Sequence, residues 1–182
     1  MKKRRVLLTG LATSLLAVAG VTSYRKSTVV ITTVAEMQAR LTALKSGTLV
    51  SVSGWSPHKV FVHLAQSIDY SMTGYPEMKS PTFQNTAGAA AFYAFSVAGA
   101  MTHNLSEPIP GAPAIAESGD TNAAIDMVIA ALQKFEQYAG EIKPHFAYGS
   151  LSKAEFAKAH VMHIENHLKA MSCGPCDLKV VE

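Results

Sequence analysis

The chain has 182 residues, with 16 Lys and Arg, 13 Asp and Glu and a formal net charge of +3. Four of the basic residues and none of the acidic ones lie in residues 1–19, so the remainder carries 12 basic and 13 acidic residues, a net charge of −1. No Lys and Arg cluster with interleaved aromatic residues is left, which argues against a nucleic-acid partner, and the remaining length suffices for one domain with a substantial core.

Residues 1–19 are typical of an export signal peptide. Residues 2–5 are all Lys or Arg, an apolar run covers residues 6–21, and the Ala-Val-Ala of residues 17–19 fits a cleavage site. The 16-residue run is shorter than the ~20 residues that span a bilayer, which favours cleavage, although an uncleaved membrane anchor stays an alternative. The Arg pair also resembles, in part, a twin-arginine signal. We therefore expect the chain to use the export machinery and to work in the periplasm or elsewhere outside the cytoplasm.

A linker over residues 20–32 leads to a series of predicted helices. Residues 33–47 form the first of them, and residues 49–53 could form a short extended link. Ser56 then supplies an N-cap ahead of a proline at the first helical position, which predicts a helix over residues 57–74. One face of this helix carries Val60, His63, Leu64, Ser67, Ile68 and Met72.

Three further helices are predicted, so the fold class is all-α. Residues 83–102 are rich in Ala, Gly and Phe, which indicates a well-buried helix. The proline-rich residues 108–113 form a loop, and an apolar periodicity predicts a helix over residues 120–139. The last helix covers residues 152–171 and opens with a Ser-x-x-Glu capping box.

Histidine spacing points to a metal site. His163 and His167 are four residues apart on the last helix, so both imidazoles lie on one helix face. With His63 they form a set of three imidazoles without a further obvious protein ligand, which is typical of a metal site with an open coordination position. His160 and Gln66 could orient ligands or substrate around it. Ordinary polar residues at the rim of a bundle would show the same spacing, so this alternative stays open.

The remaining polar signals lie in loops and in a C-terminal tail, residues 172–182. His103 and His145 are expected to be solvent-exposed, although His145 could close a fourth coordination position. Cys173 and Cys176 enclose a Gly-Pro pair after the last helix, which is the wrong context for a thioredoxin fold. In an oxidising compartment we expect a disulfide between them, with a slight stabilising effect because the loop is short. A redox or metal-delivery role is the alternative.

Several segments together carry a family resemblance. They are residues 55–66 (WSPHKVFVHLAQ), 108–113 (PIPGAP), 144–152 (PHFAYGSLS) and 160–168 (HVMHIENHL). With them the chain resembles the DinB-like (YfiT-like) superfamily of metal-binding helical-bundle proteins, in a branch described only as a domain of unknown function. The resemblance covers residues 33–171.

The resemblance implies an up-and-down four-helix bundle with an additional N-terminal helix. It also implies a divalent metal ion held by His63, His163 and His167, with zinc or nickel as first candidates and iron or manganese also compatible with imidazole ligands. Characterised relatives include metal-dependent thiol S-transferases and hydrolases, which predicts a small-molecule substrate, and a homodimer is compatible with this class. The alternative is a non-catalytic exported bundle whose metal is structural or sequestered.

Overall fold

The computed structural model describes residues 33–176; the predicted signal, the linker and the last six residues of the tail lie outside this range. This part of the chain is mostly helical, with one small two-stranded sheet. Its elements are α1 (Val34–Leu44), β1 (Thr48–Ser51), α2 (Pro57–Thr73), α3 (Pro81–Phe83), the π-helix η1 (Gln84–Gly88), α4 (Ala89–Ala98), α5 (Thr121–Gln137), α6 (Lys153–Leu168) and β2 (Met171–Gly174). Within residues 33–176, no helix combines the length and the apolarity that crossing a membrane requires.

Side-chain caps fix where the long helices begin. Ser56 and Ser152 cap α2 and α6, as the sequence predicts. Thr33 forms a second capping box at the start of α1, and the carboxylate of Asp120 accepts two backbone N–H groups at the start of α5. Each cap satisfies amide groups that have no partner inside their helix, so local sequence alone sets these four boundaries.

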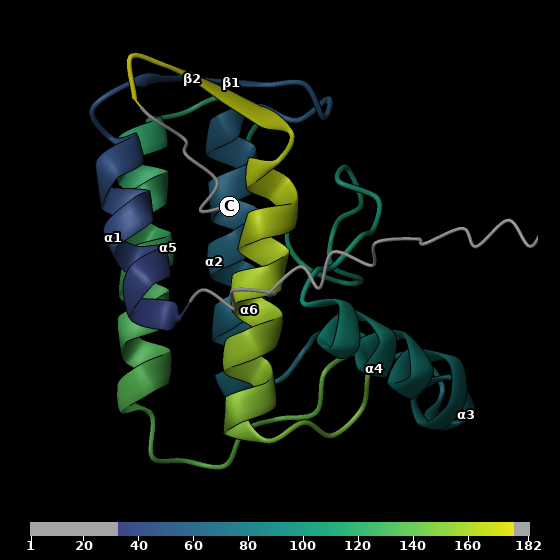
Figure 1. Cartoon of the computed structure of the whole chain (residues 1–182). Helices are drawn as coiled ribbons and strands as arrows, with labels where there is room; N and C mark the ends of the chain where they lie inside the picture. Colours follow the sequence, from purple (N-terminus) through teal and green to yellow (C-terminus); the bar gives the residue numbers. More distant parts are fainter. Residues whose placement is uncertain (1–32, 177–182) are drawn as a thin grey trace, which may run out of the picture.

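Helices α1, α2, α5 and α6 lie side by side around the main core (Figure 1). Both α1 and α2 pack against α5 and against α6. The side chains that are most completely buried in this core are Met37, Leu41, Val60, Phe61, Leu64, Ile68, Ile125, Leu132, Phe135, Phe156 and Ile164. The apolar faces that the sequence assigns to these four helices are therefore the faces that meet.

The helices that pack together in the main core are not the four of the predicted up-and-down bundle. His58 at the start of α2 contacts the carbonyl of Asp120 at the start of α5, and Asp69 near the end of α2 pairs with Lys134 near the end of α5. These two helices therefore run in the same direction, as they would in the predicted bundle, where the helix of residues 83–102 lies between them in the chain. The observed segment 81–98, however, contributes no residue to the main core. Helix α1, expected as an addition, contributes to the core like the other three.

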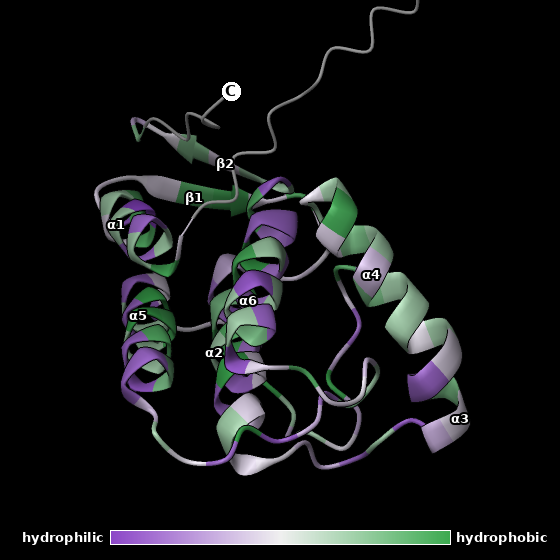
Figure 2. Cartoon of the chain, turned by 60° about the horizontal axis from the view of Figure 1, so that its bottom comes forward, coloured by the Kyte–Doolittle hydropathy of each residue, from purple (hydrophilic) through white to green (hydrophobic). Residues whose placement is uncertain are grey.

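The sequence correctly predicts a helix near residues 83–102, but the prediction that this helix is well buried is wrong. The helical segment covers residues 81–98 and contains the π-helical turn η1. Within α4 only Phe92 is buried, while Tyr93 and Val97 are 71% and 68% exposed. Figure 2 shows α4 as a largely apolar helix at the margin of the molecule. A small second core forms where it meets α6, and comprises Phe92, Met101, Ala159 and Met162.

A two-stranded antiparallel sheet lies across one end of the helices (Figure 1). The extended link predicted near residue 49 is its strand β1, and Leu49 pairs with Cys173 of β2. Strand β2 was not predicted: helix α6 ends at Leu168, and Met171 begins the strand instead of completing the helix. The all-α prediction is corrected accordingly, because the segment after α6 finds a backbone partner in β1.

Candidate metal centre

Three imidazoles from two antiparallel helices converge on one point. His63 comes from α2, and His163 and His167 come from consecutive turns of α6. The Nε2 atom of His163 lies 3.3 Å from that of His63 and 3.2 Å from that of His167. One ring nitrogen from each of the three residues lies within 4.8 Å of the other two, so together they could hold a metal ion.

The spacing of these nitrogens fits a tetrahedral ion. Metal–nitrogen distances of about 2.0–2.1 Å place the ligand nitrogens of a tetrahedral site about 3.3–3.4 Å apart. The two Nε2–Nε2 distances of 3.3 and 3.2 Å are close to that value. Only small side-chain adjustments would therefore be needed to receive an ion.

Burial keeps the three imidazoles neutral at pH 7. It lowers the pKa of His63 to about 4 and that of His167 to about 3, with neighbouring histidines adding to the effect. For His163 burial, followed by the surrounding histidines, holds the pKa well below its ordinary value. Metals bind the neutral imidazole, so this is the protonation state that ligation needs.

An aromatic ring contacts one of the three imidazoles, and two of their ring nitrogens lack a hydrogen-bond partner in residues 33–176. Trp55 packs edge-on against His63, with ring centroids 5.3 Å apart. In residues 33–176 the Nδ1 atoms of His63 and His167 are buried without a hydrogen-bond partner. Glu165, which lies between the two α6 histidines in sequence, pairs with Arg40 of α1 and is not a candidate ligand.

A fourth histidine adjoins the three. The ring centroid of His103, in the loop between α4 and α5, lies 4.9 Å from that of His163 and 5.3 Å from that of His167. Its Nε2 is buried and has no hydrogen-bond partner in the part of the chain that the structure describes. The predicted exposure of His103 is therefore wrong for this ring nitrogen. No pattern in the sequence could reveal this, because the path of the loop decides it.

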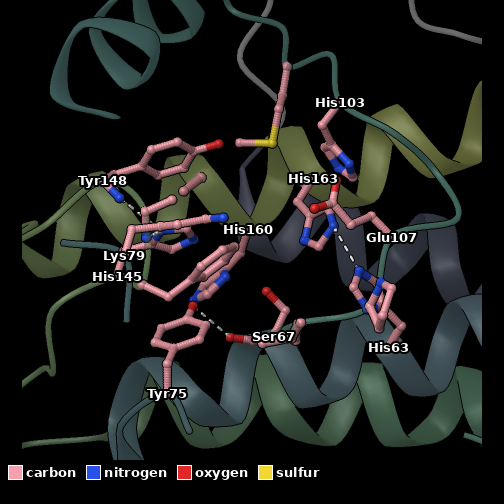
Figure 3. Close-up of a pocket in the computed structure, with 16 residues that line it drawn as sticks. His63, Ser67, Tyr75, Lys79, His103, Glu107, His145, Tyr148, His160 and His163 are labelled. Carbon is pink, nitrogen blue, oxygen red and sulfur yellow. Dashed lines mark hydrogen bonds between the residues drawn. The ribbon is translucent and has the colours of Figure 1, made fainter. Parts of the chain in front are cut away.

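A cavity of about 220 Å³ opens beside these histidines. His63, His103 and His163 line one end of it, and Figure 3 shows Glu107 directed towards the same end. Lys79 and Tyr148 point into the cavity from the opposite side. Its remaining walls are mostly apolar or aromatic and include Tyr75, Met101, Ile109, Phe146 and Ala159.

His145 lies in the wall of this cavity rather than on the surface. It is 9% exposed and stacks on Tyr148 with ring centroids 4.2 Å apart, so its predicted exposure is wrong. Its Nδ1 accepts the backbone N–H groups of Ala147 and Tyr148, which leaves the proton of the neutral ring on Nε2. His103, and not His145, is the histidine that adjoins the three candidate ligands.

The two residues predicted to support the site differ in position. His160 is buried against Phe135, lines the cavity and places its Nε2 3.3 Å from the hydroxyl oxygen of Ser71. Burial lowers its pKa to about 3. Gln66 is half-buried and is not among the described residues that line the cavity. Of the two, His160 is the one placed to act on a molecule in the cavity.

Comparisons with known proteins identify a family. A family model described as "Protein of unknown function (DUF1569)" matches residues 24–173. The matched range contains all four histidines of the cluster and most of the chain. No curated protein and no solved structure matches the chain.

Proposed function

The chain belongs to the DUF1569 family, and we propose from its own site that it is an exported divalent-metal protein acting as an enzyme on a small molecule. The ligands would be His63, His163 and His167, each through Nε2. The observation that carries the proposal is the convergence of these atoms, 3.2 and 3.3 Å apart, at the edge of a cavity. Zinc and nickel are the first candidates for the ion.

The cavity supports a catalytic rather than a purely structural role. A divalent ion held there would act as a Lewis acid, lowering the pKa of a coordinated water from about 15.7 towards about 7 or deprotonating a coordinated thiol. Lys79 and Tyr148 would bind acceptor groups of a substrate, because burial raises the pKa of the Tyr148 phenol to about 12 and keeps it protonated. His145 would add a third donor through its Nε2–H.

We propose a metal-dependent thiol S-transferase or hydrolase, the activities that the DinB-like resemblance implies. The placement of one ligand on an early helix and two on the last helix supports this assignment. The place of α1 in the core, instead of the 81–98 segment, leaves those ligand positions unchanged, since α2 and α6 pack against each other.

A non-catalytic metal-binding protein is the second candidate. The observation that favours it is the position of His103, whose buried Nε2 adjoins the three candidate ligands. Four imidazoles that stay bound would fill a tetrahedral ion and leave no position for a substrate.

Export would place the protein in an oxidising compartment. Besides the residues of the predicted signal, the tail supports this proposal: Cys173 and Cys176 are joined, with Cα atoms 5.4 Å apart, inside the usual range for a disulfide. Disulfides persist outside the cytoplasm and are rare within it.

Metal content is the direct test of the proposed function. We expect the purified full chain to carry about one divalent ion, measured by elemental analysis. His163→Ala should retain at most about a tenth of that amount, since one of three ligands is lost. His58→Ala is the matched control, because His58 contacts Asp120 at the start of α5 and not the cluster. Equal metal content in the wild type and His163→Ala would refute the ligand set.

A further inference from the structure

We infer that His103 is a fourth protein ligand of the metal centre, supplied by the loop between α4 and α5. This assignment rests on the proposed function, because it requires an ion bound by His63, His163 and His167. It adds a ligand from a loop to three ligands from helices. It also predicts that the centre is closed to a substrate until this loop residue leaves the ion.

The His103 ring lies as close to two of the candidate ligand rings as those rings lie to one another. Among the three candidate ligands the ring centroids lie 5.0, 5.1 and 5.3 Å apart. The His103 ring lies 4.9 Å from His163 and 5.3 Å from His167, the same range. The group of ligand nitrogens that lie within 4.8 Å of one another does not include His103, so its loop would have to bring the ring closer for it to share the ion.

Hydrogen bonding prepares the correct nitrogen of His103. Its Nδ1 lies 2.8 Å from the carbonyl oxygen of Asn104. A carbonyl can only accept, so Nδ1 carries the proton of the neutral ring and Nε2 carries a free lone pair. A backbone carbonyl on one nitrogen is the usual device that selects the other as the metal ligand. That other nitrogen, Nε2, is buried and unpaired among residues 33–176, so an ion would satisfy it.

The loop that carries His103 is held beside the site without being part of a helix or strand. No regular element lies between Ala98 and Thr121. The hydroxyl of Ser106 donates to the carbonyl of Ser53, which ties the loop to the segment before α2. His103 also lines the cavity, as do His63 and His163. Release of His103 would therefore free a coordination position on the cavity side.

Nuclear magnetic resonance of the histidine rings tests this assignment directly. We expect long-range ¹H–¹⁵N spectra of the zinc-loaded full chain to show four Nε2 atoms with the shift of a metal-bound nitrogen. His103→Ala should show three, and its zinc affinity, measured by chelator competition, should fall at least about tenfold. Added imidazole should restore part of that affinity by filling the vacated position. His58→Ala is the control and should keep the wild-type spectrum and affinity.

The outcomes separate this assignment from the proposed function. A wild-type spectrum with three metal-bound rings overturns the fourth ligand, even if His103→Ala weakens zinc binding through a lost hydrogen bond. Metal-bound shifts for His63, His163 and His167 in that spectrum would leave the proposed function intact. A wild-type chain that binds no divalent ion makes both wrong. Circular dichroism of His103→Ala, with His103→Gln as a second variant, ensures that a misfolded chain is not read as a lost ligand.

Discussion

Hydrogen bonds at the ring nitrogens determine which group each histidine around the cavity can present. His103 donates from Nδ1 to a carbonyl and so presents a lone pair at Nε2. His145 accepts two backbone N–H groups at Nδ1 and so presents an N–H at Nε2. His160 directs Nε2 towards Ser71, whose hydroxyl donates to the carbonyl of Ile68. Identical side chains therefore present different groups: a lone pair at Nε2 of His103, an N–H at Nε2 of His145 and a hydrogen bond to a serine at His160.

The buried, neutral His160 makes stability depend on pH. The unfolded ring takes up a proton near pH 6.5, whereas burial lowers the folded pKa to about 3. Between these values the unfolded state binds more protons, so the free energy of unfolding falls as the pH falls, by about 1.4 kcal/mol per pH unit for this one ring. Above pH 6.5 the contribution is complete and constant.

We expect His160→Leu to flatten this dependence by about that amount between pH 6 and pH 4. Urea unfolding of the metal-free chain at several pH values measures the slope without interference from an ion. His58→Ala should retain the wild-type slope. An unchanged slope in His160→Leu would mean that the folded protein protonates His160 near its ordinary pKa.

Helical spacing made three of the site histidines predictable. His163 and His167 share a face because they are four residues apart, and His63 follows the apolar stripe of its helix. His103 and His145 were expected at the surface because the sequence around them has no periodicity. Their burial follows from where two loops cross the helices, which depends on contacts between distant residues.

At the scale of elements, Gly88 allows the helical segment of residues 81–98 to pack closely against a loop in the cavity wall. It is buried in η1, and an added Cβ there would overlap the carbonyl oxygen of Ala147, in the loop that carries His145. Glycine thus permits a close approach that brings the 81–98 segment against the cavity wall. Neither packed element can retreat far, because Lys79 and Phe146 are joined by a backbone hydrogen bond nearby.

We expect Gly88→Ala to lower the free energy of unfolding by about 1–3 kcal/mol, the usual effect of overpacking. Denaturant unfolding of the full chain measures this. Gly174→Ala is the matched control, since an added Cβ at that strand position meets no atom within 4 Å, and it should stay within about 0.5 kcal/mol of the wild type. Equal stability of the two variants would show that the loop can yield to the added methyl group.

Local sequence signals predicted where the helices begin better than they predicted which helices are buried. Ser56 and Ser152 mark true starts because a cap acts on amide groups within the same turn. The Ala-rich segment near residue 90 was predicted to be buried, yet composition cannot reveal which side of a helix finds a partner. Strand β2 was also missed, because its only reason to be extended is pairing with β1, more than a hundred residues earlier.

At the scale of the whole molecule, the crossover of residues 74–120 sets the helix order. It contains the helical segment 81–98, which was predicted as a bundle helix but lies outside the main core, where α1 packs instead. Apolar periodicity identifies the faces that form a core but does not specify which helices meet. The ion pair of Asp69 with Lys134 agrees with the shared direction of α2 and α5 that the prediction implies.

The disulfide of the tail lies against the turn that follows α1. An added Cβ at Gly47 would lie 2.6 Å from each of the two cysteine sulfurs, so the tail packs directly on this residue. We expect Cys173→Ser combined with Cys176→Ser to lower the free energy of unfolding by at most about 2 kcal/mol, given the short loop. Metal content by elemental analysis should stay unchanged. A loss of the ion in the double variant would instead implicate the tail in metal delivery.

Trp55 is the only tryptophan of the chain, and its ring lies against His63 on one side and beneath the ammonium of Lys59 at 4.8 Å on the other. Ultraviolet emission from this protein therefore has a single indole source, placed next to one proposed ligand. We expect titrated Ni²⁺ to quench that emission in the wild type and much less in His163→Ala. The molecule carries its own optical indicator of occupancy, which needs no attached dye and can be followed on the timescale of mixing.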